Sequence, residues 1–289
     1  MEALALAPDS ARIEVQCLLQ LVLNVTRAYL PTHPERRLNT PEQARYDELL
    51  QRRLQGEPIA YLLGEREFFG LMFKVTSDTL IPRPETELLV ELALQRISPY
   101  PLPQAGEGGH QAGRGYEFRV LDLGTGSGAI ALAIADQHSN IKVLACDISA
   151  AALEVARENA QRLNITNVAF VHSDWFQSLA GVRYNIIVAN PPYIAASDPH
   201  LAQGDVRFEP PSALASGNDG LQDIRQIISQ AKNHLQAGGW LLLEHGYDQA
   251  AQVRELLQQA GLGEVFSTRD LAGIERVSGG RADYSGPRI

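Results

Sequence analysis

The chain has 289 residues, which is enough for one large domain or for a large domain together with a small one. Hydrophobic residues make up 45 % of the sequence, so we expect a packed core and exclude a largely disordered chain. The formal net charge of −9 argues against a broad grip on duplex DNA, because such a grip needs clustered lysine and arginine.

Motifs for disulfides, metals and membranes are missing from the sequence. The two cysteines, Cys17 and Cys146, are too few for a disulfide framework and indicate a reducing compartment. Neither CxxC nor HExxH occurs, so we expect no metal site. The start, MEALALAPDS, lacks the charged region of a signal peptide, and the apolar run AIALAIA is too short to span a bilayer. These patterns favour a cytoplasmic protein without a membrane segment.

The first sixty residues predict a small helical domain, which we place at residues 1–64. Helical periodicity over residues 9–30 puts Ile13, Cys17, Leu21, Val25 and Ala28 on one face, with Asp9 or Ser10 as the cap. A second helix is expected from Thr40 to about Gln55, with Thr40 as its cap and Gln43 completing a capping box. Glu57-Pro58 predicts a third, short helix.

Residues 65–84 predict a hairpin and a linker. The run EREFFGLMFKVT at residues 65–76 is typical of two short strands with Gly70 near their turn. The run LIPRPETELLVELALQRI that follows reads as a proline-rich loop that leads into a helix. Residues 99–117 are rich in Pro and Gly without periodicity, so we expect a flexible insertion there.

From Arg119 onward, short apolar runs alternate with helices of about 10 to 15 residues, a pattern typical of parallel strands buried on both faces. We therefore predict an α/β fold with a doubly wound, mostly parallel sheet in a domain at residues 85–289. The run GEVFSTRDLAGIERV near the end predicts an antiparallel hairpin added to that sheet.

A glycine loop, DLGTGSG, lies between the first strand of this sheet and its helix, at residues 122–128. Such a loop lets a ligand approach the backbone closely, and Asp147 at the end of the next strand is placed to accept from ribose hydroxyls. The spacing G-x-G-x-G differs from the dinucleotide motif, and a carboxylate at Asp122 would repel a pyrophosphate. A cationic ligand with a ribose, such as S-adenosylmethionine, fits this loop better.

The segment SDWF follows the third strand of the sheet. Asp174 is placed to reach an adenine amino group, and Trp175 is placed to cover the adenine ring. A tryptophan buried in the core beside a turn accounts for the same pattern equally well.

The fourth strand ends in Asn190-Pro191-Pro192-Tyr193, at the edge of the sheet where the glycine loop also lies. We predict that the Asn190 oxygen and the Pro191 carbonyl accept the two N–H groups of a planar amide or exocyclic amine, with Tyr193 stacked on it. These bonds would favour a tetrahedral nitrogen whose lone pair faces the methyl donor.

Three further residues attract attention without a firm role. Glu244, which ends a strand before His245, suggests acid–base chemistry, but a structural role fits it better. Glu209 is placed either to bind the substrate or to brace a loop, and Arg83 to brace the cofactor side of the site.

The sequence resembles the protein-(glutamine-N5) methyltransferases that act on bacterial peptide chain release factors. The resemblance covers nearly the whole chain after about residue 50, through the segments GEREFFG, LIPRPETELLVE, DLGTGSGAIALA, CDIS, SDWF, NPPYI, FEPPSALASGNDGL and GGWLLLEHG. Asn-Pro-Pro-Tyr is shared with nucleic-acid amino-methyltransferases, whereas IPRPETE together with the FEP segment is far more specific.

The resemblance implies a class I S-adenosylmethionine-dependent methyltransferase fold and methylation of the glutamine in the Gly-Gly-Gln motif of release factors. It implies that the helical domain docks the release factor. It assigns cofactor roles to Gly124, Thr125, Gly126, Ser127, Gly128, Asp147, Trp175 and Asn190, the substrate-amide role to Asn190, Pro191, Pro192 and Tyr193, and catalysis to Asn190, Pro191 and Tyr193.

Two alternatives stay open at this point. A nucleic-acid amino-methyltransferase would act on adenine N6 or guanine N2, but the acidic balance and the lack of a basic stripe with interleaved aromatics argue against it. A non-catalytic adaptor would bind release factors or ribosomes, but the complete glycine loop and Asn-Pro-Pro-Tyr argue against that.

Overall fold

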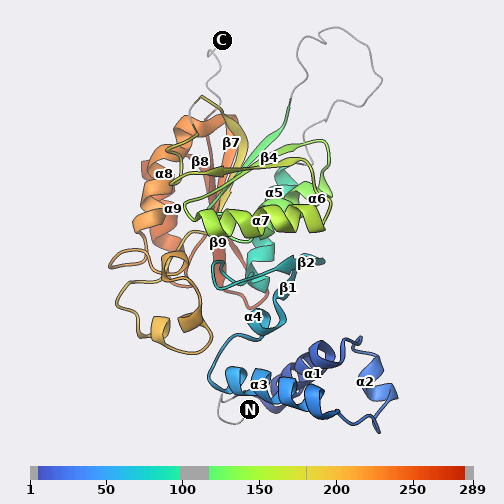
Figure 1. The fold of residues 1–289 in the computed structure, drawn as a ribbon. Coiled ribbons are helices and arrows are strands. Elements are labelled where there is room, and N and C mark those ends of the chain that lie inside the picture. The colour runs from blue at the N-terminus through green and yellow to red at the C-terminus, as the bar shows by residue number, and fades with distance from the viewer. Residues whose placement is uncertain (1–5, 98–116, 180, 284–289) are drawn as a thin grey trace, which may run out of the picture.

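The computed structural model describes residues 6–97, 117–179 and 181–283, so the predicted insertion at 99–117 lies almost wholly outside the described residues. The chain forms a bundle of helices at its N-terminal end, a sheet flanked by helices, and a small hairpin between them (Figure 1). The N-terminal helices are α1 (Pro8–Leu23), α2 (Tyr29–Thr32), α3 (Thr40–Leu54) and α4 (Ile59–Leu63).

The first helix is shorter than its periodicity predicts, and its most buried residues lie beside the predicted stripe, of which Leu21 still packs against the same core. It ends at Leu23 because Asn24 adopts the left-handed conformation, and it begins at Pro8, so neither Asp9 nor Ser10 is its cap. Leu18 and Val22 pack against α3 and α4, whereas Ile13 on the predicted face is 50 % exposed. The correct stripe is shifted by about one residue from the predicted one.

The second predicted helix, α3, is capped one residue earlier than expected. Asn39 Oδ1 accepts from the amide of Glu42 at 3.0 Å, and Glu42 Oε2 accepts from the amide of Asn39 at 2.8 Å. Thr40 with Gln43 shows the same spacing, but a charged carboxylate makes the stronger return bond, so Asn39 and Glu42 form the capping box.

The predicted hairpin is confirmed as β1 (Glu65–Phe68) and β2 (Leu71–Lys74), which pair antiparallel around Phe69 and Gly70. Both turn residues have positive φ, as a tight two-residue hairpin turn requires. The proline-rich run then forms a short 3₁₀ helix, η2 (Pro84–Thr86), and leads into α5 (Glu87–Ile97).

The large domain has a seven-stranded sheet in the order β5-β4-β3-β6-β7-β9-β8, which confirms the predicted α/β class. Strands β3 to β7 are mutually parallel, and β9 runs antiparallel to both β7 and β8. The strands are β3 (Arg119–Leu123), β4 (Lys142–Asp147), β5 (Val168–His172), β6 (Tyr184–Ala189), β7 (Leu235–Glu244), β8 (Gly263–Arg269) and β9 (Glu275–Arg281).

Two apolar cores cover the two faces of the sheet. Val120 faces a core shared with α5 and α6, whereas Leu121 and Leu123 face a core shared with α8 and α9. This alternation explains why β3 is apolar almost throughout, as expected for a strand buried on both faces. The helices are α6 (Ala129–Gln137), α7 (Ala150–Arg162), α8 (Gln222–His234) and α9 (Ala250–Gln259).

Gly279 provides a test of how tightly the antiparallel strands pack. A Cβ at this position of β9 would lie 2.7 Å from Leu242 Cδ2 and 2.8 Å from the backbone oxygen of Leu241. We expect Gly279→Ala to lower the free energy of unfolding by about 1–3 kcal/mol in urea denaturation, as overpacking does. Gly263→Ala in β8 is the control, because its Cβ would meet nothing closer than 3.8 Å. Equal stability of the two variants would contradict this account of the packing.

Candidate functional site

A cavity of about 360 Å³ lies where β3, β4 and β6 end, at the carboxyl edge of the sheet. This edge is where doubly wound sheets bind their ligands. The cavity is lined by residues at or after the ends of four strands, by two loops and by the starts of α7 and α8: Gly124, Gly126, Asp147, Ile148, Ser149, Ala152, Ser173, Asp174, Trp175, Asn190 and Pro192, with Ser77, Asp78, Thr79, Leu80, Pro210, Ser212, Ala213 and Asp223.

The glycine loop forms the floor of the cavity, but its residues have different roles. Gly126 has φ +56°, and a Cβ there would meet nothing within 4 Å, so its backbone is open to a ligand. Gly124 and Gly126 line the cavity, whereas Thr125, Ser127 and Gly128 do not. Gly128 is instead the N-cap of α6, and a Cβ on it would lie 3.2 Å from the Cβ of Ala156.

Asp147 is at the end of β4, where the sequence predicts it. Its Oδ2 accepts from the amide of Gly126 at 2.8 Å, and its Oδ1 accepts from the amide of Ser149 at 2.8 Å. Burial raises the pKa of Asp147, and the backbone donors oppose that rise. A carboxylate offers about four acceptor positions, and the amides of Gly126, Ser149 and Ile148 use three of them, so one remains for a hydroxyl of a ligand in the cavity.

Asp122 is not at the cavity wall, which corrects the expectation that its charge meets the ligand. Its side chain is fully buried, and its Oδ2 accepts from Thr125 Oγ1 at 2.6 Å. Burial raises the pKa of Asp122 to about 7. Asp122 therefore braces the glycine loop from beneath and acts on a bound ligand only through its field.

Trp175 lines the cavity beside Asp174, in a backbone conformation with φ +45°. Its carbonyl oxygen accepts from Ser173 Oγ at 2.8 Å, which helps to fix this unusual turn. Its ring also lies over Gly124, where a Cβ would come within 3.3 Å of it. The indole therefore lies where it can cover a flat ring of a ligand in the cavity.

Asn190 and Pro192 reach the cavity from the end of β6. Asn190 Nδ2 donates to Thr86 Oγ1 at 3.2 Å, whereas Asn190 Oδ1 is buried and has no hydrogen-bond partner among the described residues. A buried acceptor without a partner costs free energy in a folded protein, so it indicates a place where a ligand completes the bond.

The rest of the Asn-Pro-Pro-Tyr motif faces other ways. Pro191 is buried and does not line the cavity. The hydroxyl of Tyr193 donates to Glu244 Oε1 at 3.4 Å, and its carbonyl oxygen accepts from Gln249 Nε2 at 3.0 Å. The motif therefore has one side toward the cavity and one side tied to the core.

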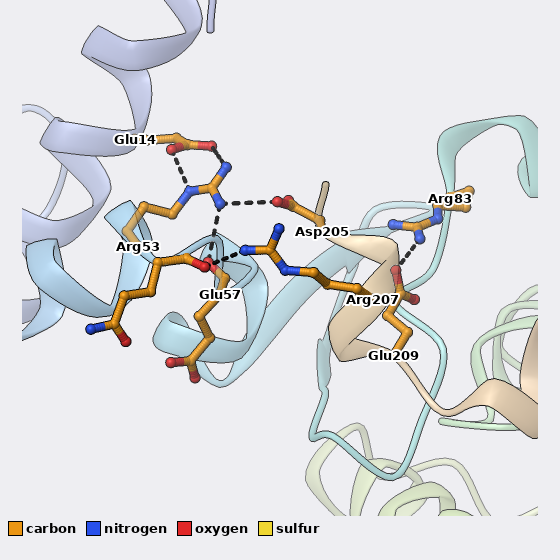
Figure 2. Close-up of polar contacts among 8 residues, drawn as sticks. Glu14, Arg53, Glu57, Arg83, Asp205, Arg207 and Glu209 are labelled. Atoms are coloured by element: carbon orange, nitrogen blue, oxygen red, sulfur yellow. Dashed lines mark hydrogen bonds and ion pairs between the residues drawn. The ribbon is translucent and has the colours of Figure 1, made fainter. Parts of the chain in front are cut away.

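The loop between β6 and α8 closes one side of the cavity and is held from two directions (Figure 2). Glu209 is buried, accepts from the amide of Ile81 at 3.0 Å and pairs with Arg83, so the structure shows the bracing contact rather than a contact to the cavity. Arg207 donates to the carbonyl oxygen of Gln55 at the end of α3.

Arg53 links the same loop to the N-terminal helices. It is 2 % exposed, pairs with Glu14 of α1 through two bonds of 2.7 and 3.0 Å, and reaches Asp205 at 2.9 Å (Figure 2). Polar contacts therefore tie the loop that walls the cavity to the helical bundle.

Sequence reasoning missed two parts of the site. The wall at Ser77–Leu80 follows the hairpin, where the sequence carries no chemical signal. Thr86 contacts Asn190 across 104 residues of chain, and the run IPRPETE identifies the segment without identifying this contact.

Two kinds of feature are absent from the described residues. No group of three His, Cys, Asp or Glu side chains gathers in an arrangement that would hold a metal ion. Within the same residues, no helix has the length and hydropathy needed to cross a bilayer.

The fold has solved counterparts. The catalytic domain of hMettl16, crystallised with MAT2A 3'UTR hairpin 6, gives a TM-score of 0.56 over 79 % of this chain and 81 % of that one. At 19 % sequence identity this likeness shows the fold alone.

Sequence similarity is far more specific. Residues 2–64 match the PrmC N-terminal domain, and residues 112–207 match the methyltransferase small domain. The release factor glutamine methyltransferase of Xylella fastidiosa (strain Temecula1) is 48 % identical over 270 residues, which are 93 % of each chain. The enzyme of that name from Bordetella pertussis (strain Tohama I) is 50 % identical over 274 residues, 94 % of this chain and 96 % of that one. The chain therefore belongs to the family of release factor glutamine methyltransferases.

Proposed function

We propose that this protein transfers a methyl group from S-adenosylmethionine to the side-chain amide nitrogen, N5, of the glutamine in the Gly-Gly-Gln motif of peptide chain release factors. The observation that carries the proposal is Asn190, which lines the same cavity as Gly126 and Asp147 and whose Oδ1 is a buried acceptor without a partner among the described residues. Family membership supports the protein substrate, because the relatives are named for it.

The residues of the cavity fit S-adenosylmethionine. Asp147 would hold the ribose hydroxyls, the open backbone of Gly126 would lie against the ligand, and Trp175 would cover the adenine. Thr125 and Ser127 would contribute only through the shape of the loop. When bound, this donor supplies an electrophilic methyl group on a sulfonium.

The chain's own residues act on the acceptor. An amide nitrogen is a weak nucleophile because its lone pair is delocalised, so the enzyme must favour a pyramidal nitrogen. Asn190 Oδ1 would accept one N–H of the substrate amide. The Pro191 carbonyl receives no backbone hydrogen bond among the described residues, but Pro191 does not line the cavity, so its acceptance of the other N–H stays a prediction. The substrate nitrogen then forms its new bond to carbon as the carbon–sulfur bond breaks, and one amide proton leaves to solvent.

We further infer that residues 1–64 dock the release factor, that residues 65–84 connect the two parts, and that residues 85–289 carry catalysis. The polar network around Arg53 supports this division, because it joins the helical bundle to the loop that walls the cavity (Figure 2). A substrate held on the helices would thereby be aligned with Asn190. The proposed substrate also places the enzyme in the cytoplasm, where translation ends.

A direct test separates this proposal from nucleic-acid methylation and from a non-catalytic adaptor role. The protein is incubated with labelled S-adenosylmethionine, a purified release factor and total RNA, and the label is located by mass analysis. We expect one methyl group on the glutamine of Gly-Gly-Gln and none on a release factor in which that glutamine is replaced. Label in RNA supports the first alternative, and binding without label supports the second.

Asp147→Ala should weaken cofactor binding, because the ribose would lose its charged acceptor. We expect a loss of roughly 1.5 to 3 kcal/mol, the range for hydrogen bonds to charged groups. Since Asp147 also accepts from Gly126 and Ser149, Asp147→Asn is the control that keeps an acceptor in place. Calorimetric titration that gives wild-type affinity for Asp147→Ala would refute the ribose role.

Asn190→Ala should lower kcat by roughly 10² to 10³, as loss of one polar contact at a reacting centre does, with little change in cofactor affinity. Asn190→Asp keeps a hydrogen-bond acceptor and should retain more activity than Asn190→Ala. The measurement is single-turnover methyl transfer at saturating cofactor. Wild-type turnover by the alanine variant would reduce Asn190 to a turn residue.

Asp205→Ala tests whether the link to the helices aligns the substrate. Asp205 is 40 % exposed, so its loss should cost less than about 1 kcal/mol of stability. We expect KM for the release factor to rise about 3- to 10-fold, or roughly 0.7 to 1.4 kcal/mol, with cofactor affinity unchanged. Asp219→Ala is the matched control, because Asp219 lies in the same loop and pairs with Arg225 of α8 without reaching the N-terminal helices. An equal effect of both variants would argue against alignment by the helices.

A further inference from the structure

A buried carboxyl group lies behind the cavity wall, where the mechanism above does not use it. Glu244 ends β7 and is 1 % exposed, and it does not line the cavity. Its Oε1 accepts from the hydroxyl of Tyr193, and its Oε2 is buried without a hydrogen-bond partner of ordinary length among the described residues. The hydroxyl of Thr86 faces this carboxyl group as a donor.

Thr86 therefore stands between Glu244 and Asn190. Its Oγ1 accepts from Asn190 Nδ2 at 3.2 Å, and its one hydroxyl proton is left for the Glu244 carboxyl group. Asn190, Thr86 and Glu244 thus form a series of hydrogen-bonding side chains that runs from the cavity wall through η2 to the end of β7. Each end of the series has one buried oxygen without a described partner, Asn190 Oδ1 and Glu244 Oε2.

The direction of these bonds decides how Asn190 faces the substrate. An asparagine amide can turn by 180°, which exchanges its oxygen and nitrogen, and only the oxygen can accept an N–H of the substrate. An ionised carboxylate only accepts, so Thr86 must give its proton to Glu244 and accept from Asn190. That arrangement selects Asn190 Nδ2 for Thr86 and leaves Oδ1 for the cavity.

We propose that Glu244 is a positioning residue that acts through the Thr86 hydroxyl to keep Asn190 Oδ1 turned toward the substrate amide. The inference rests on the proposed function of Asn190 as the acceptor for that amide. It assigns Glu244 neither a contact with the substrate nor the role of a base.

The charge state of Glu244 follows from the groups around it. Burial raises the pKa of Glu244 to about 7; the Thr86 hydroxyl, Arg276 of β9 and the Tyr193 hydroxyl lower it, and Glu85 of η2 raises it. Below about pH 7 the protonated carboxyl group becomes a donor, and the direction of the series is no longer fixed. Activity that depends on this direction should fall as the pH drops through that value.

Four enzymes test the proposal in single-turnover methylation of a release factor between pH 5.5 and 9: wild type, Glu244→Gln, Thr86→Val and Thr86→Ser. The wild type should lose activity toward low pH with an apparent pKa near 7. Glu244→Gln and Thr86→Val should lose this dependence and lower kcat by roughly 10- to 100-fold, the range for partners that orient a functional group. KM should change little. Thr86→Ser keeps the hydroxyl and should keep both the rate and the pH dependence.

The outcomes separate positioning from other roles. If Glu244→Gln turns over like wild type at all pH values, the proposal is wrong. If Thr86→Val keeps the wild-type rate and pH dependence, Glu244 does not act through Thr86. If the wild type methylates RNA instead of a release factor, the proposed function fails, and the same four enzymes are compared on that RNA.

A measurement without substrate gives an independent answer. The side-chain amide signals of ¹⁵N-labelled Asn190 should shift with an apparent pKa near 7 in the wild type and in Thr86→Ser. They should not shift in Glu244→Gln or Thr86→Val, and a shift in Thr86→Val would overturn the proposal.

Thermal stability distinguishes positioning from a structural role. Since the folded-state pKa of Glu244 is raised, the neutral form stabilises the fold at low pH, and that stability is lost as the pH rises through about 7. Glu244→Gln should therefore have a higher Tm than wild type at pH 8.5 and a similar Tm at pH 4, below the ordinary glutamate pKa of 4.5. A lower Tm at both pH values, with kcat reduced in proportion to the folded fraction, would indicate a merely structural role.

Discussion

The place of β3 between β4 and β6 is the constraint on which the site depends. Parallel pairing on both sides of β3 brings three strand ends to one edge of the sheet, with Leu123 opposite Cys146 on one side and Ala189 on the other. The glycine loop, Asp147 and Asn190 each follow directly from one of these strands. Gly124 and Asn190, which lie 66 positions apart in the sequence, therefore share one cavity, and a shift in register would separate them.

The site holds carboxyl groups in surroundings that disfavour their charge. Burial raises the pKa of both Asp122 and Glu244 to about 7, and each faces a threonine hydroxyl. Neither carboxyl group lines the cavity, but each contacts a threonine next to residues that do. Asp122 contacts Thr125, whose neighbours Gly124 and Gly126 line the cavity. Glu244 faces Thr86, which contacts Asn190. Buried charges of this kind are poor stabilisers, so their presence is better explained by the orientation that they impose on the cavity wall.

Features of the fold and the site that depend on neighbouring residues could be predicted from the sequence, whereas contacts between residues far apart in the chain could not. The strands of the sheet could be predicted because a strand buried on both faces has apolar side chains at consecutive positions. The prediction of Thr40 as a helix cap was wrong, because the capping box of Asn39 and Glu42 has the same spacing as that of Thr40 and Gln43, one residue earlier. The expectation that Asp122 faces the ligand was wrong. The sequence shows that a carboxylate precedes the glycine loop, but it does not show the direction in which the side chain points. The Thr86–Asn190 contact could not be predicted, because it arises only when η2 packs against the end of β6.

The loop after Asn-Pro-Pro-Tyr connects the helical bundle to the wall of the cavity. Its residues alternate between partners: Asp205 and Arg207 reach α3, Glu209 holds the segment before η2, and Pro210 lines the cavity. Within six residues, the loop thus contacts the helical bundle, the segment that leads to Thr86, and the cavity itself (Figure 2). Arg53 is buried and each of its three guanidinium nitrogens donates at this junction, so the helices cannot tilt without moving the loop or breaking charged hydrogen bonds. A large partner held on the bundle would therefore meet a cavity wall whose position is already fixed relative to that bundle.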